Sequence, residues 1–201
     1  MSNFEKYLQE SYGKHNPKEI EELVLDEIWV NKISFTDDEK TCLEKYTNLI
    51  HLSLNNLGLK TLKNFPSIKN LYYLSIKNNE FTGDDFEEIP KLYPRLNKLK
   101  ISGNSIEKID NLRNLRNLKL RKIEVKENPF SIDKKNYIKN VFEIIPSLEI
   151  VDEKTKSGDE VDTTDYHQSD EESGEKDDEY EEEENENVEE DEEDEDEEGD
   201  D

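Results

Sequence analysis

The chain has 201 residues and a formal net charge of −26 at pH 7, with 53 acidic and 27 basic side chains. The charge is uneven: residues 157–201 hold 28 acids and one base, which leaves 25 acids and 26 bases in residues 1–156. The single cysteine excludes an intramolecular disulfide, and no apolar run approaches the roughly 20 residues that span a bilayer. Because the first residues also lack a signal-peptide pattern, we expect a soluble, intracellular protein without a membrane segment.

The first residues predict a helix that covers the front of the fold. Phe4, Tyr7, Leu8 and Tyr12 recur at helical spacing, and Ser2 with Glu5 forms a capping-box pattern. Pro17 then precedes the first predicted strand.

Five copies of the pattern LxxLxLxxN follow, with aliphatic residues at the first, fourth and sixth positions. They begin at Ile20, Leu49, Leu71, Leu96 and Leu120, so the start-to-start spacings are 29, 22, 25 and 24 residues. The last three copies place asparagine at the ninth position, as Asn79, Asn104 and Asn128, whereas the first two have Ile28 and Leu57 there. The spacing is typical of leucine-rich repeats, which run over roughly 20–29 residues. A second register for the fifth copy, Leu115, Leu118 and Leu120, is also readable.

Each repeat is expected to supply one short strand, because its xxLxL stretch alternates between apolar and polar residues. The strands stack in parallel, since a single repeat cannot bury its own apolar face. The ninth-position asparagine should bond backbone groups at the bend after the strand. Between the first two repeats, Thr36 and Glu39 predict a capping box on a short helix, in which Cys42 packs inward.

The strand residues that point away from the core form the predicted concave face. They occupy the third, fifth and seventh repeat positions: Glu22, Val24, Asp26, His51, Ser53, Asn55, Tyr73, Ser75, Lys77, Lys98, Lys100, Ser102, Lys122, Glu124 and Lys126. From these we predict partner-binding residues Glu22, Asp26, His51, Asn55, Tyr73, Lys77, Lys98, Lys100 and Lys122. The face runs from acidic to basic, so its basic half is expected to dock an acidic partner, with the chain's own acidic tail as the nearest one.

A second helix should close the back of the stack. Tyr137, Val141, Phe142 and Ile145 lie on one helical face, Pro146 ends that helix, and Leu148 and Val151 follow. The fold class is therefore α/β: a right-handed leucine-rich-repeat horseshoe of about five repeats with helical caps. We place the repeat domain at residues 1–154 and a polyacidic tail at residues 155–201.

The tail contains too few apolar residues to offset the cost of ordering its backbone, so we predict that it is disordered. A flexible polyanion is expected to attract basic partners by long-range steering that salt weakens. The predicted contact residues are Glu181, Glu182, Glu183, Glu184, Glu189, Glu190, Asp191, Glu192, Glu193 and Asp194. Ser157 and Ser169 each have an acid three residues on, a pattern typical of substrates of acid-directed kinases.

Four segments resemble the acidic leucine-rich nuclear phosphoprotein family. They are PKEIEELVLD at residues 17–26, LKISGNSIEKIDNL at 99–112, LRNLKL at 115–120 and YIKNVFEIIPSLEIVD at 137–152, and the acidic tail matches in type. The resemblance implies histone binding, masking of histone tails, inhibition of a protein phosphatase, and movement between nucleus and cytoplasm. The chain ends DEDEEGDD, without the basic import cluster that the family often carries.

We therefore expect a monomeric, histone-binding, chaperone-like protein, present in nucleus and cytoplasm. The alternative is a phosphatase inhibitor or adaptor that binds through the concave face. We expect no enzyme activity, because His15, His51 and His167 lie far apart and no phosphate loop, metal-ligand cluster or nucleophile motif occurs. No metal or cofactor is expected, and the attached polyanion disfavours direct nucleic-acid binding.

Overall fold

The computed structural model describes residues 3–28, 31–132 and 136–161. The front cap is the helix α1 (Asn3–Tyr12), as the helical spacing predicted. Its side chains Phe4 and Leu8 are buried against the first repeat, while Tyr7 and Tyr12 are partly buried against the core. Ser2, the predicted capping residue, lies outside the described residues. No helix of the described part of the chain is both long and apolar enough to cross a membrane.

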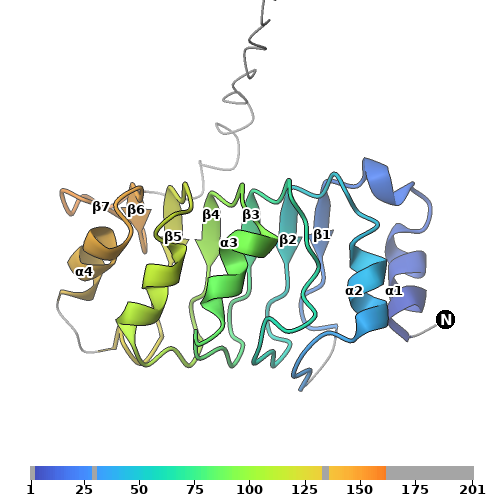
Figure 1. Ribbon diagram of the computed structural model, residues 1–201, viewed down its shortest axis with the longest axis horizontal. Coiled ribbons are helices and arrows are strands. Elements are labelled where there is room, and N and C mark those ends of the chain that lie inside the picture. The colour runs from blue at the N-terminus through green and yellow to red at the C-terminus, as the bar shows by residue number, and fades with distance from the viewer. Residues whose placement is uncertain (1–2, 29–30, 133–135, 162–201) are drawn as a thin grey trace, which may run out of the picture. The chain divides into compact units, whose positions relative to one another are not determined.

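The repeat strands stand side by side in one sheet, in chain order (Figure 1). They are β1 (Glu22–Val24), β2 (His51–Ser53), β3 (Tyr73–Ser75), β4 (Lys98–Lys100) and β5 (Lys122–Glu124), and each pairs in parallel with the next. The fourth-position residues Leu23, Leu52, Leu74, Leu99 and Ile123 are in register and at most 1% exposed. The predicted stack of parallel strands over one continuous core is thus confirmed, with the fifth strand in the register that begins at Leu120.

Helical turns on the return side of the repeats close the core opposite the sheet. They are α2 (Asp37–Leu43), η2 (Phe86–Glu88), α3 (Ile89–Leu92) and η3 (Ile109–Leu115), whereas η1 (Pro17–Glu19) precedes β1 and buries none of its residues. A row of buried phenylalanines links successive turns, with ring centroids 5.1 Å apart between Phe35 and Phe65 and 6.0 Å apart between Phe65 and Phe81. This row extends the core across the repeats on the helical side.

The helix α2 begins with the predicted capping box. Thr36 Oγ1 accepts the Glu39 amide at 3.3 Å, and Glu39 Oε2 accepts the Thr36 amide at 2.8 Å. Cys42 packs inward at 7% exposure, as expected.

The bend after each strand depends on one backbone conformation and one side chain. The eighth-position residues all have positive φ: Glu27, Asn56, Asn78, Gly103 and Glu127. At Gly103 a Cβ would lie 2.1 Å from Asn78 Oδ1, so the close approach of these two bends explains the glycine there. The ninth-position asparagine then bonds the backbone, as predicted: Asn79 Nδ2 donates to Leu54 and Ile76 carbonyls at 2.9 and 3.0 Å, and its Oδ1 accepts the Leu57 and Leu59 amides. Each such asparagine therefore ties its own repeat to the preceding one.

The back of the stack is closed by the helix α4 (Tyr137–Ile144), whose side chains Val141 and Ile144 are buried, as the predicted cap requires. The chain then adds a sixth parallel strand, β6 (Ile150–Val151), beside β5. Strand β7 (Lys154–Thr155) pairs with β6 in the antiparallel direction. The proposed domain boundary between residues 154 and 155 falls inside β7, and the described body continues to Val161.

Candidate partner-binding face

The concave face is most accessible on β1 and least accessible on β5, although the change is not steady, since Ser75 of β3 is buried and Lys100 of β4 is partly exposed. The third and fifth positions are exposed on β1, partly buried on β2 and β4, and buried on β5. Lys122 is 7% exposed and Glu124 is 5% exposed, although both occupy positions that the repeat pattern assigns to solvent. Among the predicted binding residues, Glu22 is exposed, whereas His51, Tyr73, Lys77 and Lys98 are partly buried. The accessible part of the face is therefore on β1–β4.

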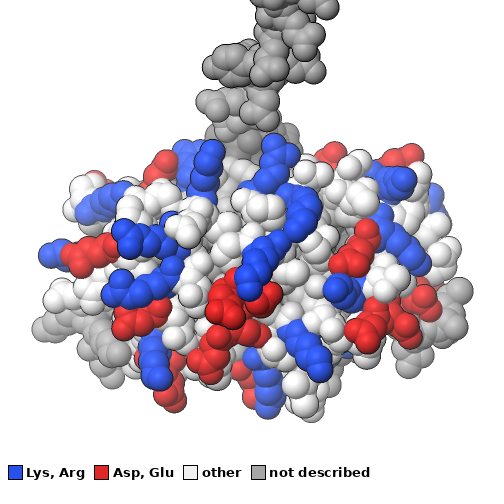
Figure 2. Space-filling model, in the orientation of Figure 1, with Lys and Arg blue, Asp and Glu red and all other residues white. Residues whose placement is uncertain are grey.

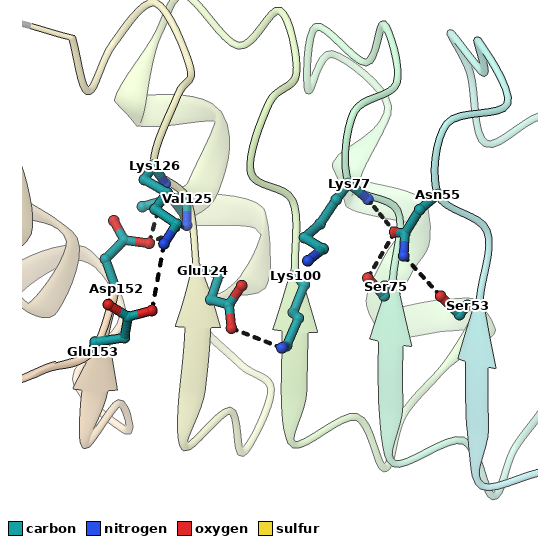
Figure 3. A network of polar contacts seen from close by, with 10 residues as sticks. All are labelled: Ser53, Asn55, Ser75, Lys77, Lys100, Glu124, Val125, Lys126, Asp152 and Glu153. Atoms are coloured by element: carbon teal, nitrogen blue, oxygen red, sulfur yellow. Dashed lines mark hydrogen bonds and ion pairs between the residues drawn. The ribbon is translucent and has the colours of Figure 1, made fainter. Parts of the chain in front are cut away.

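A polar network joins the first three repeats above the strand ends, and Figure 3 shows its part on the second and third repeats. Asp26 Oδ1 accepts the Asn55 amide at 2.8 Å and the Ser53 hydroxyl at 2.7 Å. Asn55 Oδ1 in turn accepts the Lys77 amide and the Ser75 hydroxyl, each at 2.7 Å. The Asn55 side-chain amide also donates to Asp26 and Ser53, at 2.8 and 2.9 Å. Asp26 and Asn55, both predicted to bind a partner, thus hold neighbouring repeats together.

An aromatic and charged cluster occupies the middle of the face. The rings of His51 and Tyr73 have centroids 5.3 Å apart, and Lys100 Nζ lies 5.7 Å from the Tyr73 ring centroid. The same ammonium pairs with Glu124 at 2.9 Å. Burial raises the pKa of the Tyr73 hydroxyl, although nearby Lys100 opposes that shift. Tyr73 is therefore a neutral, partly buried ring, suited to contact an apolar or cationic group of a partner.

Carboxylates are interleaved with the lysines of the predicted basic half. Lys100 pairs with Glu124, and Lys126 Nζ lies 3.4 Å from Glu153 Oε1. Burial lowers the pKa of Lys122, and the neighbouring Lys98 and Lys100 act in the same direction. The gradient from acidic to basic is consequently weaker than the list of side chains indicates. On the face that carries α3 and α4, basic and acidic side chains also alternate (Figure 2).

Sequence reasoning missed Asp152, which repeats the role of Asp26 at the other end of the network. Asp152 Oδ1 accepts the Val125 amide at 2.7 Å and the Lys126 amide at 3.1 Å, and Tyr137 Oη donates to its Oδ2 at 3.0 Å. Burial raises the pKa of this carboxyl group, against the effect of the three donors. The available signal was the spacing of Leu148 and Val151, which matches the first and fourth positions of a sixth, shortened repeat.

No group of three or more metal-binding side chains is found among the residues that the structure describes. The Cys42 thiol donates a hydrogen bond to Glu5 Oε1 at 3.5 Å. Burial and the nearby Glu5 carboxylate both raise the pKa of the thiol. A raised thiol pKa disfavours nucleophilic reactivity.

Several predicted sites fall outside the described residues. These are the tail acids Glu181–Glu184 and Glu189–Asp194, together with Ser169 and the predicted disorder of the tail. Ser157 is described and exposed; its hydroxyl lies within hydrogen-bond distance of Asp159 and 2.8 Å from Thr155 Oγ1. Its phosphorylation remains a prediction, as does docking of the tail on the concave face.

The parallel strands, the left-handed bends and the asparagine ladder together define a leucine-rich-repeat protein, and the leucine-rich-repeat family model matches residues 15–177. An acidic leucine-rich nuclear phosphoprotein 32-related protein of Caenorhabditis elegans is 32% identical over 168 residues, which cover 78% of this chain and 67% of the relative. The chain belongs to the acidic leucine-rich nuclear phosphoprotein 32 family.

Other similarities extend this picture. A Plasmodium falciparum protein of the same family is 32% identical over 155 residues, covering 76% of this chain, and the chain spans 54% of that relative's length. A Tetrahymena thermophila protein that carries a histone name is 31% identical over 140 residues, covering 66% of this chain and 36% of that protein. Among solved structures, the Drosophila melanogaster SNF/U2A' complex matches with a TM-score of 0.55 and 24% identity, over 75% of this chain and 79% of the matched chain. The structural match supports the fold alone.

Proposed function

We propose that this protein binds basic proteins, histones foremost, and shields them as a chaperone does. The observation that carries the proposal is the charge distribution: 28 acids and one base in residues 157–201, beside a body with 25 acids and 26 bases. A dense run of carboxylates attracts Lys- and Arg-rich partners and accelerates their encounter. Salt weakens that attraction, because the Debye length is about 8 Å at physiological ionic strength.

The family relationship supports a role in chromatin. The relatives are named as nuclear phosphoproteins, and one similar protein is named as a histone. We therefore propose that the protein acts in the nucleus and also occurs in the cytoplasm. In this proposal the acidic run supplies the attraction, and the accessible part of the concave face selects among basic partners through Tyr73 and Glu22.

The test is binding of purified core histones across a salt series. We would compare the full chain with a tail-neutral variant, in which every Asp and Glu of residues 162–201 is replaced by Asn or Gln. Because that variant leaves residues 1–161 unchanged, it serves as a matched control for the body. We expect strong binding by the full chain that falls steeply with salt, and weak binding by the tail-neutral variant. Equal binding by both would contradict a role for the tail.

An adaptor or phosphatase-inhibitor role is the second candidate, favoured by the paired His51 and Tyr73 rings on an accessible stretch of β2 and β3. A Tyr73→Ala variant separates the two candidates. If the second is correct, this change weakens partner binding and the tail-neutral change does not. Histone binding that depends mainly on the tail predicts instead that the tail-neutral change weakens binding more than Tyr73→Ala does.

A further inference from the structure

The polar network on the concave face follows a rule from one repeat to the next. The seventh-position side chain of a repeat accepts the seventh-position backbone amide of the following repeat. Asp26 accepts the Asn55 amide at 2.8 Å, and Asn55 accepts the Lys77 amide at 2.7 Å. At the far end Asp152 serves the Lys126 amide from the opposite side, at 3.1 Å. Three of the steps therefore have an oxygen acceptor in place.

The rule fails at the step from β3 to β4. The seventh-position residue there is Lys77, whose ammonium has no lone pair with which to accept a hydrogen bond. The residue that needs the acceptor is Ser102, which is 3% exposed. Its hydroxyl has no hydrogen-bond partner, and none is found for its backbone amide within the described residues. A buried donor without an acceptor costs about 1–3 kcal/mol, so an acceptor that reaches Ser102 is favoured.

Positive charge surrounds this gap. Asn78, the residue after Lys77, donates its amide to the Ser102 carbonyl at 2.9 Å, and Gly103 donates to the Lys126 carbonyl at 3.0 Å, so Ser102 lies between those two lysines. Lys126 has Glu153 as its partner, whereas no carboxylate contacts Lys77 Nζ among the described residues. In Figure 3 the Lys77 side chain extends toward Lys100, whose own charge is met by Glu124. Among the described residues, the Lys77 ammonium thus has no carboxylate partner, and the Ser102 hydroxyl on the next repeat has no acceptor.

We propose that Lys77 and Ser102 form a binding site for a carboxylate side chain of an acidic peptide. A carboxylate is an acceptor only and has two oxygens, so one oxygen takes the Ser102 donors while the other faces Lys77 Nζ. The bound carboxylate would accept the Ser102 amide in the same way that the Asp26 carboxylate accepts the Asn55 amide at the front of the network. The site is independent of the proposed histone binding, since it takes an acidic ligand and lies on the body.

Two sources can supply such a carboxylate: an acidic partner, or the acidic run of this same chain. The two sources can be separated experimentally. The tail-neutral variant removes the acids of residues 162–201 and leaves Lys77 and Ser102 in place. A short polyglutamate peptide with a blocked C-terminus then represents the partner.

The experiment follows the Ser102 amide resonance by NMR during titration with that peptide. In the tail-neutral variant we expect a saturable shift of this resonance. Lys77→Gln or Ser102→Ala should weaken the binding by about tenfold, as loss of a charge-assisted hydrogen bond predicts. Lys119→Gln removes one exposed lysine outside the site and is the matched control, which should leave the binding unchanged.

A third substitution tests the geometry. Lys77→Asn places at this step the residue that Asn55 provides one repeat earlier, so it should shift the Ser102 resonance without any peptide and abolish the response to peptide. In the unmodified chain, a resonance already at the bound position would identify the chain's own acids as the ligand, and a resonance at the free position would identify an external partner. If the tail-neutral variant shows no saturable shift, or if Lys77→Gln and Lys119→Gln respond alike, the gap holds water only and the proposal is overturned.

Discussion

Replacing Asn79 with alanine tests the asparagine ladder that holds the bends. The side chain is 6% exposed and serves backbone groups of two repeats. Its amide donates to the Leu54 and Ile76 carbonyls, and its oxygen accepts the Leu57 and Leu59 amides, all at 2.9–3.1 Å. Alanine leaves the Leu54 carbonyl and the Leu57 and Leu59 amides without this partner, whereas the Ile76 carbonyl keeps the Asn104 side-chain amide at 3.0 Å.

Each buried backbone group left unsatisfied costs about 1–3 kcal/mol, and partial relaxation or entry of water reduces the sum. We therefore expect Asn79→Ala to lower the free energy of unfolding by about 3–5 kcal/mol, a large part of the roughly 5–15 kcal/mol of a typical domain. The assay is urea denaturation followed by circular dichroism. Asn140→Ala, at an exposed position of α4, is the control and should change the free energy by less than about 0.5 kcal/mol. A loss below about 1 kcal/mol for Asn79→Ala would refute the reasoning.

Three further predictions concern the caps and the buried groups. Thr36→Ala should lower the free energy of unfolding by about 1 kcal/mol through loss of the capping box, measured by the same denaturation; no change would remove the cap as a cause of stability. Cys42 should react with a thiol probe far more slowly in the native protein than in urea, because its thiol pKa is raised and the side chain is buried; equal rates would contradict that burial. The Asp152 carboxyl has a raised pKa in the folded state, so its contribution to stability is fully present below its unfolded pKa and is lost as pH rises through the folded value. The difference in unfolding free energy between the native protein and Asp152→Asn should therefore fall as pH rises from the unfolded to the folded pKa of Asp152. A difference that rises instead would contradict the raised pKa in the folded state.

The repeat pattern predicted most of the fold because its physical basis is local. Leu23, Leu52 and Leu74 alternate with polar residues over a few positions, which defines a strand with one buried face. The stacking then follows, since no repeat can bury its aliphatic residues alone. The strand β6 was not predicted, because Ile150 and Val151 come from a shortened repeat that lacks the later aliphatic pair and the asparagine.

The accessibility of the concave face was harder to predict. The alternation places Lys122 and Glu124 toward solvent, yet both are buried. Their burial depends on long side chains of neighbouring strands, such as Lys100, which reaches across to Glu124. The gap at Ser102 likewise depends on which residue stands at the same position one repeat earlier. These properties arise between repeats, so a reading of each repeat by itself does not reveal them.

The two ends of the sheet determine how the molecule behaves at high concentration. A stack of parallel strands has no intrinsic stop, because its outermost strands present unpaired backbone groups to any similar edge. At the front the Tyr12 hydroxyl occupies the edge of β1, accepting the Val24 amide at 3.2 Å and donating to the Val24 carbonyl at 3.3 Å. At the back β7 runs antiparallel to β6, so the last strand has the wrong direction to continue the series. One copy therefore does not offer the next a matching edge, and the body is protected against end-to-end growth into filaments.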